Sequence, residues 1–113
     1  MDDCLFCKIY RGEIPSEILH KDDHCFAIKD INPVSPVHLL IIPSVHLTYL
    51  QSFEVEDFRI LNSMYKVAAE LAVREGISES GYRLVINQKR DSGQQVPHLH
   101  LHLIGGHNLA GIG

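Results

Sequence analysis

The chain has 113 residues, of which 45% are hydrophobic and 21% charged, so we expect one globular domain over residues 1–113. Its formal charge of −4 argues against a protein held on nucleic acid by phosphate neutralisation. The acidic start lacks the basic and apolar regions of a secretory signal, and the longest apolar run, Leu39–Ile42, is too short to span a bilayer. We therefore expect a cytoplasmic protein with neither a membrane nor a nucleic acid as partner.

The first predicted elements are a short N-terminal turn or helix and two or three strands. Residues 24–31 alternate between the two faces of an extended chain and end at "NPVSP", which is typical of a strand followed by a turn. Residues 38–43, "HLLIIP", are apolar on both faces, and this pattern predicts a central strand.

Residues 53–75 change to the period of a helix. Apolar side chains recur there at steps of three and four, as in a helix that lies on a sheet. We expect Ser52 to be the N-cap, and the acidic residues at positions 54, 56 and 57 suit the positive end of the helix dipole. Gly76 is the expected C-terminal glycine.

Two more strands are predicted after this helix, over residues 82–87 and 98–104. They are joined by the polar, glycine-containing stretch 88–97, whose length suggests a binding role. Successive strands without helical crossovers favour an antiparallel sheet, so the predicted class is α+β.

Three histidines alternate with leucines in "HLHLH", residues 98–102. In a strand the histidines share one face and the leucines share the other, which would pack under the helix. Adjacent histidines would lie about 6.6 Å apart, too far to bind one metal ion together. Such a row suits nucleophilic attack and proton transfer at phosphorus, and the alternative is a solvated or core face of histidines. The preceding "SGQQV" could cradle an anion with backbone N–H groups, although most such stretches are turns.

The pair Cys4-x-x-Cys7 has the spacing of two thiolate ligands on one zinc ion. A third cysteine, Cys25, makes the number odd, which argues against a disulfide framework. A redox pair and two small buried hydrophobic residues are the alternatives to a metal site. The histidines that could complete a tetrahedral set are His20, His24, His38, His46, His98 and His107.

Taken together, these motifs resemble the histidine triad (HIT) superfamily of nucleotide hydrolases and transferases. "HLHLHLI" is similar to its His-φ-His-φ-His-φ-φ signature, and "CLFCKIYRGEIPSEI", "DINPVSPVHLLIIPSVHL" and "GYRLVINQ" stand in the family's order. "IGG" after the triad is most similar to the Hint branch, the purine nucleoside phosphoramidases. The resemblance implies a five-stranded antiparallel sheet with one long helix and a short N-terminal helix, in a homodimer whose sheets join into ten strands.

The resemblance also implies roles for single residues. His100 would attack the α-phosphate of an AMP or GMP conjugate, and His102 would bind phosphate oxygens and assist the leaving group. His38 would assist the triad by hydrogen bonding, and Asp30 would bind the ribose hydroxyls. The residues that would hold the phosphate are Asn87, Gly93, Gln94 and Val96. The residues that would form an apolar slot for the base, with ordinary core as the alternative, are Leu5, Phe6, Ile9, Ile28 and Ile31.

Zinc-containing members of the superfamily imply a closed structural Zn²⁺ site made of Cys4, Cys7, His46 and His98. The chain departs from many Hint proteins at Gln95, where they carry a serine that helps the leaving amine, and its tail lacks a tryptophan seen in some of them. The expected activity is hydrolysis of purine nucleoside 5′-phosphoramidates through a nucleotidyl-histidine. The alternatives are a dinucleoside polyphosphate hydrolase of the same superfamily and a regulatory nucleotide-binding dimer with little turnover.

Overall fold

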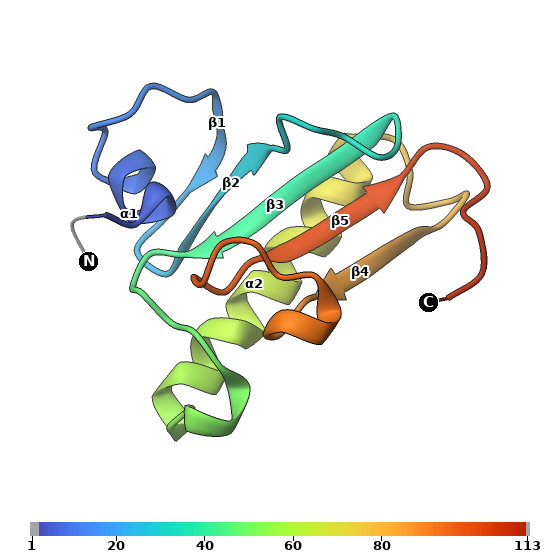
Figure 1. The fold of residues 1–113 in the computed structure, drawn as a ribbon. Coiled ribbons are helices and arrows are strands. Elements are labelled where there is room, and N and C mark those ends of the chain that lie inside the picture. Colours follow the sequence, from blue (N-terminus) through green and yellow to red (C-terminus); the bar gives the residue numbers. More distant parts are fainter. Residues whose placement is uncertain (1–2, 113) are drawn as a thin grey trace.

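A computed structural model describes residues 3–112 and shows a five-stranded sheet with helices on both faces (Figure 1). The sheet order is β1-β2-β3-β5-β4, and every neighbouring pair is antiparallel. The elements are α1 (Leu5–Tyr10), β1 (Ile18–Lys21), β2 (Cys25–Lys29), β3 (Val37–Pro43), α2 (Val55–Arg74), β4 (Tyr82–Ile86) and β5 (Leu101–Gly105), with short 3-10 helices at Leu50–Ser52 and Arg90–Ser92. This confirms the predicted α+β class. None of the described helices is long and apolar enough to cross a membrane.

The long helix α2 carries the chain from β3 to β4 at the edge of the sheet, and the loop 88–97 returns it to β5 between them (Figure 1). The strand that bears the histidines is therefore central, with β3 on one side and β4 on the other. A central strand is held by ladder hydrogen bonds along both edges, so its side chains have fixed directions.

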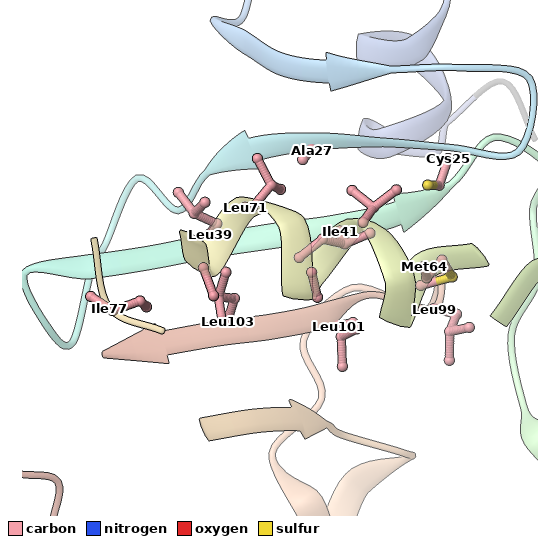
Figure 2. Close-up of a cluster of buried hydrophobic side chains, with 13 residues drawn as sticks. Cys25, Ala27, Leu39, Ile41, Met64, Leu71, Ile77, Leu99, Leu101 and Leu103 are labelled. Atoms are coloured by element: carbon pink, nitrogen blue, oxygen red, sulfur yellow. The ribbon is translucent and has the colours of Figure 1, made fainter. Parts of the chain in front are cut away.

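One face of the sheet packs against α2 and forms the larger core cluster (Figure 2). Leu99, Leu101 and Leu103 are fully buried in it, beside Leu39 and Ile41 of β3. The prediction that the leucines of the histidine row pack under the long helix is confirmed. Because side chains alternate along a strand, the histidines must face the other way.

The opposite face of the sheet carries α1. Phe6 and Ile9 of this helix pack on Phe26 and Ile28 of β2 and on Leu40 of β3 in a second, smaller cluster. His38 lies two residues before Leu40 and so shares its face of β3. The side chains of His38 and His100 thus lie on the same side of the sheet as the N-terminal helix α1.

The strand predicted over residues 98–104 is shorter than expected at its start, because β5 begins at Leu101. Its last pair with β3 is Ile41 with Leu101, two residues before Pro43, which has no N–H to continue a ladder. The N–H of Leu99 donates instead to the carbonyl oxygen of Leu47, at 2.7 Å. His98 and His100 therefore precede the regular strand, although alternate residues still point to opposite faces.

The predicted N-cap of the long helix, Ser52, was wrong. Ser52 ends a 3-10 turn, and its N–H donates to the carbonyl oxygen of Tyr49 at 3.0 Å. Glu54 is the N-cap, and its N–H donates to a carboxylate oxygen of Asp57 at 2.9 Å in a reciprocal capping box. The other predicted bounds also shift slightly: residues 24–31, 38–43 and 82–87 become Cys25–Lys29, Val37–Pro43 and Tyr82–Ile86.

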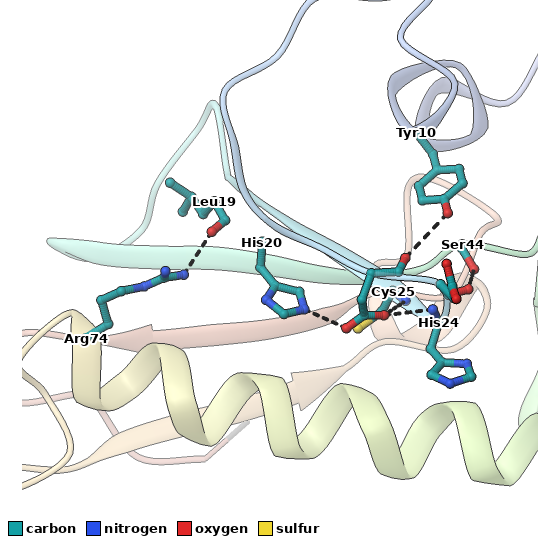
Figure 3. A network of polar contacts seen from close by, with 9 residues as sticks. Tyr10, Leu19, His20, His24, Cys25, Ser44 and Arg74 are labelled. Carbon is teal, nitrogen blue, oxygen red and sulfur yellow. Dashed lines mark hydrogen bonds and ion pairs between the residues drawn. The ribbon is translucent and has the colours of Figure 1, made fainter.

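The β1–β2 hairpin is closed by the side chain of Asp22. Its partners His20, His24 and Cys25 are labelled in Figure 3. One carboxylate oxygen accepts from the N–H groups of His24 and Cys25 at 2.7 and 2.9 Å, and the other lies 2.6 Å from Nε2 of His20. Burial would raise the pKa of Asp22, but these hydrogen bonds hold it below its usual value. The carboxylate therefore has a structural task in the turn.

Replacing Asp22 should destabilise this hairpin. We expect D22A to lower the free energy of unfolding by about 1–2 kcal/mol, because two turn N–H groups lose their acceptor. Urea unfolding measures the difference, with D23N as the matched control since Asp23 is exposed beside it. Equal stability of D22A and D23N would contradict this role for Asp22.

Candidate active site and metal centre

The middle histidine of the row, His100, has a defined tautomer. Its Nδ1 lies 2.8 Å from the carbonyl oxygen of His98, and a carbonyl only accepts, so Nδ1 carries the hydrogen. In the neutral ring the other nitrogen, Nε2, then holds a free lone pair. His100 as a residue is 8% exposed, and its ring packs edge-on against Phe6, with 5.2 Å between the centroids. His100 can therefore act as a nucleophile.

The third histidine, His102, is joined to His38 of β3. Nε2 of His38 lies 2.9 Å from Nδ1 of His102. Nδ1 of His38 accepts the main-chain N–H of Val34 at 3.1 Å, so the hydrogen of a neutral His38 is on Nε2. When Nε2 of His38 donates this hydrogen to His102, the hydrogen of His102 is on its own Nε2. That atom is buried and has no hydrogen-bond partner among the described residues.

Asp30, which follows β2, approaches the same nitrogen of His38. Its Oδ2 is 3.3 Å from Nε2 of His38, and its Oδ1 accepts the N–H of Asn32 at 2.8 Å. The structure thus brings together three of the predicted site residues: Asp30, His38 and His102.

Both histidines of this pair are neutral near pH 7. Burial, with the neighbouring histidines adding to it, lowers the pKa of His102 to about 4. Burial also lowers the pKa of His38, and the nearby Asp30 carboxylate opposes that shift without cancelling it. A neutral ring is the state in which the tautomer matters, since it has one donor and one acceptor nitrogen.

An apolar cavity of about 210 Å³ lies between α1 and the sheet. All five residues predicted for the base slot line it: Leu5, Phe6, Ile9, Ile28 and Ile31. Phe6, Ile9 and Ile28 are also members of the smaller core cluster, whereas Ile31 is 89% exposed and Leu5 is 42% exposed. The wall of this cavity is therefore core, and its rim is open.

The loop predicted to hold phosphate leads from β4 to the histidine row. Asn87 directly follows β4, and Gly93 has a φ of +87°, a conformation that favours glycine. The Gln94 side chain bonds within the loop, since it accepts the N–H of Lys89 at 2.7 Å and donates to the carbonyl oxygen of Val96 at 3.1 Å. The side chain of Gln94 thus shapes the loop.

The four predicted metal ligands lie together beside α1. Sγ of Cys4 and Nδ1 of His98 are 3.1 Å apart, and Sγ of Cys7 is 3.4 Å from Nδ1 of His46. All four ligand atoms lie within 4.8 Å of one another. Zinc–ligand bonds of about 2.1–2.3 Å in a tetrahedron put ligand atoms roughly 3.6 Å apart, so the set fits. Nε2 of His98 donates to the carbonyl oxygen of Pro43 at 3.1 Å, which directs Nδ1 toward the thiols.

Two of these groups, the Cys7 thiol and the His98 imidazole, are neutral near pH 7 in the metal-free protein. Burial and the neighbouring Cys4 raise the pKa of Cys7 to about 11, and burial lowers the pKa of His98 to about 4. A thiol gives up its proton when it coordinates a metal, so binding of a soft cation would change the charge of this cluster.

Two other groups of potential ligands have tasks without a metal. His20, Asp22 and Cys25 lie together, but the Asp22 carboxylate already closes the β1–β2 hairpin. The other group is the hydrogen-bonded set of Asp30, His38 and His102. Of the histidines that the sequence left open as ligands, the structure brings His46 and His98 to the cysteine pair.

The sequence interpretation missed part of the apolar cavity. Leu40 lines it, and its position two residues after His38 on a strand places both on one face, which the period of two could have revealed. Ile14, Pro15 and Ser16 also line it, from the segment between α1 and β1. That segment has no periodic pattern that would have pointed to the cavity.

Known proteins share both the sequence and the fold of this chain. A family model described as "HIT domain" matches residues 11–109. The chain is 44% identical to a purine nucleoside phosphoramidase of Escherichia coli, over 96% of this chain and 91% of that protein. Among solved structures, a HIT family hydrolase from Legionella pneumophila superposes with a TM-score of 0.92 at 44% identity, covering 96% of each chain. A zinc-bound histidine triad family protein from Mycobacterium smegmatis gives a TM-score of 0.79 at 30% identity, covering 95% of this chain and 77% of that one.

The burial of His102 predicts an unusual titration. Its ring nitrogens should show neutral imidazole in ¹⁵N NMR spectra down to about pH 4, because burial lowers its pKa to that value. The unfolded chain takes up this proton near the ordinary His pKa of about 6.5, so the free energy of unfolding should fall as pH drops from about 6.5 to 4. A His102 ring that becomes charged near pH 6.5 in the folded protein would contradict this.

Proposed function

The chain belongs to the HIT domain family of hydrolases, and we propose that it cleaves the P–N bond of purine nucleoside 5′-phosphoramidates through a nucleotidyl intermediate on His100. The observation that carries the proposal is the hydrogen bond from Nδ1 of His100 to the carbonyl oxygen of His98. This bond leaves the Nε2 lone pair free, which is what attack on phosphorus requires.

The proposed reaction has two steps. In the first, Nε2 of His100 forms a bond to the α-phosphorus while the P–N bond of the substrate breaks, and the amine leaves with a proton taken from solvent. In the second, water attacks phosphorus and its proton returns to solvent, while the electron pair of the His100–phosphorus bond returns to Nε2. The Nε2 hydrogen of His102 would donate to a phosphate oxygen and assist departure of the amine.

The nucleoside would lie beside this centre. Phe6 both lines the apolar cavity and packs on the ring of His100, so a base in that cavity is close to the nucleophile. Asp30 would accept hydrogen bonds from the ribose hydroxyls. Backbone N–H groups of the loop at Gly93–Val96 would hold phosphate oxygens, together with Asn87.

The covalent step predicts a labelled enzyme. With adenosine 5′-phosphoramidate labelled at its phosphorus, rapid acid-free quenching should trap label on the wild-type protein, since a phosphorus–imidazole bond breaks in acid. We expect no trapped label and at least a thousandfold lower kcat for H100A, as for removal of other catalytic nucleophiles. H24A is the matched control, because His24 is exposed and lies outside the site.

A wild-type enzyme that turns over this substrate without a trapped intermediate, or an H100A protein that still becomes labelled, would contradict the mechanism. Tight binding of AMP without any turnover would favour a regulatory nucleotide-binding protein instead.

We also propose that Cys4, Cys7, His46 and His98 hold one structural zinc ion. The support is the fit of the four ligand atoms, together with the zinc-bound relative from Mycobacterium smegmatis. When bound, the ion would tie α1 to the residues that precede β5 and add stability without contacting the substrate. The chain would thereby hold the carbonyl oxygen of His98 in place for His100.

Metal analysis tests the zinc proposal. We expect about one zinc ion per chain in the wild type and less than a tenth of that in C7S. Removal of the metal by a chelator should lower the melting temperature of the wild type by several degrees, because binding energy is folding energy here. The H24A protein should keep its zinc. A wild type that folds with full stability and binds no metal would contradict the proposal.

For the assembly, we propose a homodimer formed through β4. This strand ends the sheet, and no strand pairs with its outer edge among residues 3–112. Two such edges can pair in antiparallel fashion and would join two five-stranded sheets into one of ten strands.

A further inference from the structure

Cys4 and Cys7 are two free thiols that the proposed reaction does not use. Sγ of Cys4 lies 3.1 Å from Nδ1 of His98, and Sγ of Cys7 lies 3.6 Å from the same atom. Because Nε2 of His98 donates to a carbonyl oxygen, Nδ1 of the neutral ring is an acceptor. Both thiols therefore converge on one lone pair, and their sulfur atoms lie within 4.8 Å of each other.

The local geometry favours a bond between these two sulfur atoms. Cys4 is the N-cap of α1, Cys7 lies in its first turn, and the N–H of Cys7 donates to Sγ of Cys4 at 3.4 Å. The C-x-x-C spacing is the one in which disulfide oxidoreductases make and break a disulfide. A disulfide needs about 2.0 Å between its sulfur atoms, so closing this bond would move residues 4–7.

The two thiols differ in their access to solvent. Cys4 is half-buried and lines an open cavity of about 510 Å³, whose wall also includes Leu5 and Gln95. A cavity of this size admits a small organic molecule. Cys7, in contrast, is only 7% exposed. A small disulfide reagent would therefore meet Sγ of Cys4 first.

Phe6 connects the cysteine pair to the histidine row. It lies between the two cysteines in the chain, and its ring packs edge-on against His98 and His100, with 5.7 and 5.2 Å between the centroids. It also lines the apolar cavity beneath α1. Since Phe6 is inside the segment that a disulfide would close, the bond would move this ring relative to His100.

We propose that Cys4 and Cys7 are a reversible redox site, which a low-molecular-weight disulfide such as glutathione disulfide converts into an intramolecular disulfide. Sγ of Cys4 attacks one sulfur of the reagent, whose S–S bond breaks to leave a mixed disulfide on Cys4 and one free thiol. Sγ of Cys7 then attacks Sγ of Cys4 and releases the second thiol. The two thiol hydrogens and two electrons of the cysteines thus pass to the reagent.

This oxidation has two consequences for the protein. It removes two of the four ligands of the proposed zinc ion, because the sulfur atoms of a disulfide are no longer thiolates. It also displaces Phe6 from the ring of His100, which lowers the rate of the reaction. The effect on catalysis rests on the proposed function, whereas the disulfide and the movement of Phe6 do not.

Mass spectrometry after treatment with glutathione disulfide tests the bond. The wild type should become lighter by two hydrogen atoms, with Cys4 and Cys7 in one cross-linked peptide, and should recover its mass in dithiothreitol. C7S should stop as a glutathione adduct on Cys4, and C4S should not react, because Cys7 is buried. C25A is the matched control and should behave as the wild type, since Cys25 is fully buried outside the pair. A wild type that keeps both thiols, or that stops as a glutathione adduct, would overturn the proposal.

The second experiment follows the site in the same oxidised protein. The NMR signals of the Phe6 and His100 rings should shift, and zinc bound by the reduced protein should be released to a chromogenic chelator as the disulfide forms. The kcat for adenosine 5′-phosphoramidate should fall about tenfold and recover in dithiothreitol, because a displacement of roughly 1 Å at a reacting centre can cost up to about a hundredfold.

A Cys4–Cys7 disulfide that leaves the ring signals of Phe6 and His100 unchanged would overturn the proposed link to the site. If the reduced protein does not turn over the phosphoramidate, the proposed function fails, and the cross-linked peptide and the ring signals still decide this inference.

Discussion

The structure of the site depends on the position of His98, whose ring and carbonyl oxygen contact different parts of it. Its ring lies among Cys4, Cys7 and His46, and its carbonyl oxygen accepts the hydrogen of the His100 ring. One residue thus joins the N-terminal helix to the His100 ring. A displacement of this residue would disturb both the cysteine–histidine cluster and the tautomer of His100. The residue lies before the regular strand, where its main chain is free to make these contacts.

Main-chain groups set the protonation of the histidines. A carbonyl oxygen holds the hydrogen of His100 on Nδ1, another directs His98, and the N–H of Val34 assigns the hydrogen of His38. Backbone groups keep a fixed donor or acceptor character at every pH, so they orient a titratable ring more reliably than another side chain could.

Where the sequence interpretation failed, a competing main-chain contact decided the outcome. The strand predicted from residue 98 begins at Leu101 because Pro43 cannot extend the ladder, and the N-cap is Glu54 because Asp57 can cap it in return. The "GG" that follows the histidine row shows the same limit. A side chain at Gly105 would approach Ile77 to 2.9 Å, and Gly106 has a φ of +99°, and neither fact can be read from the order of residues.

The sequence by itself determined the class of fold and the two faces of the histidine strand, and it named the candidate site residues, because a period of two and a ligand spacing are local properties. The spacing of Cys4 and Cys7 left six histidines open as ligands, and the family resemblance pointed to His46 and His98. Only the tertiary structure decided how close these ligand atoms come, how Asp30 meets His38 and which nitrogen of the His38 and His100 rings holds its hydrogen. Those choices depend on contacts between segments up to 94 residues apart, which chain folding alone brings within hydrogen-bonding distance.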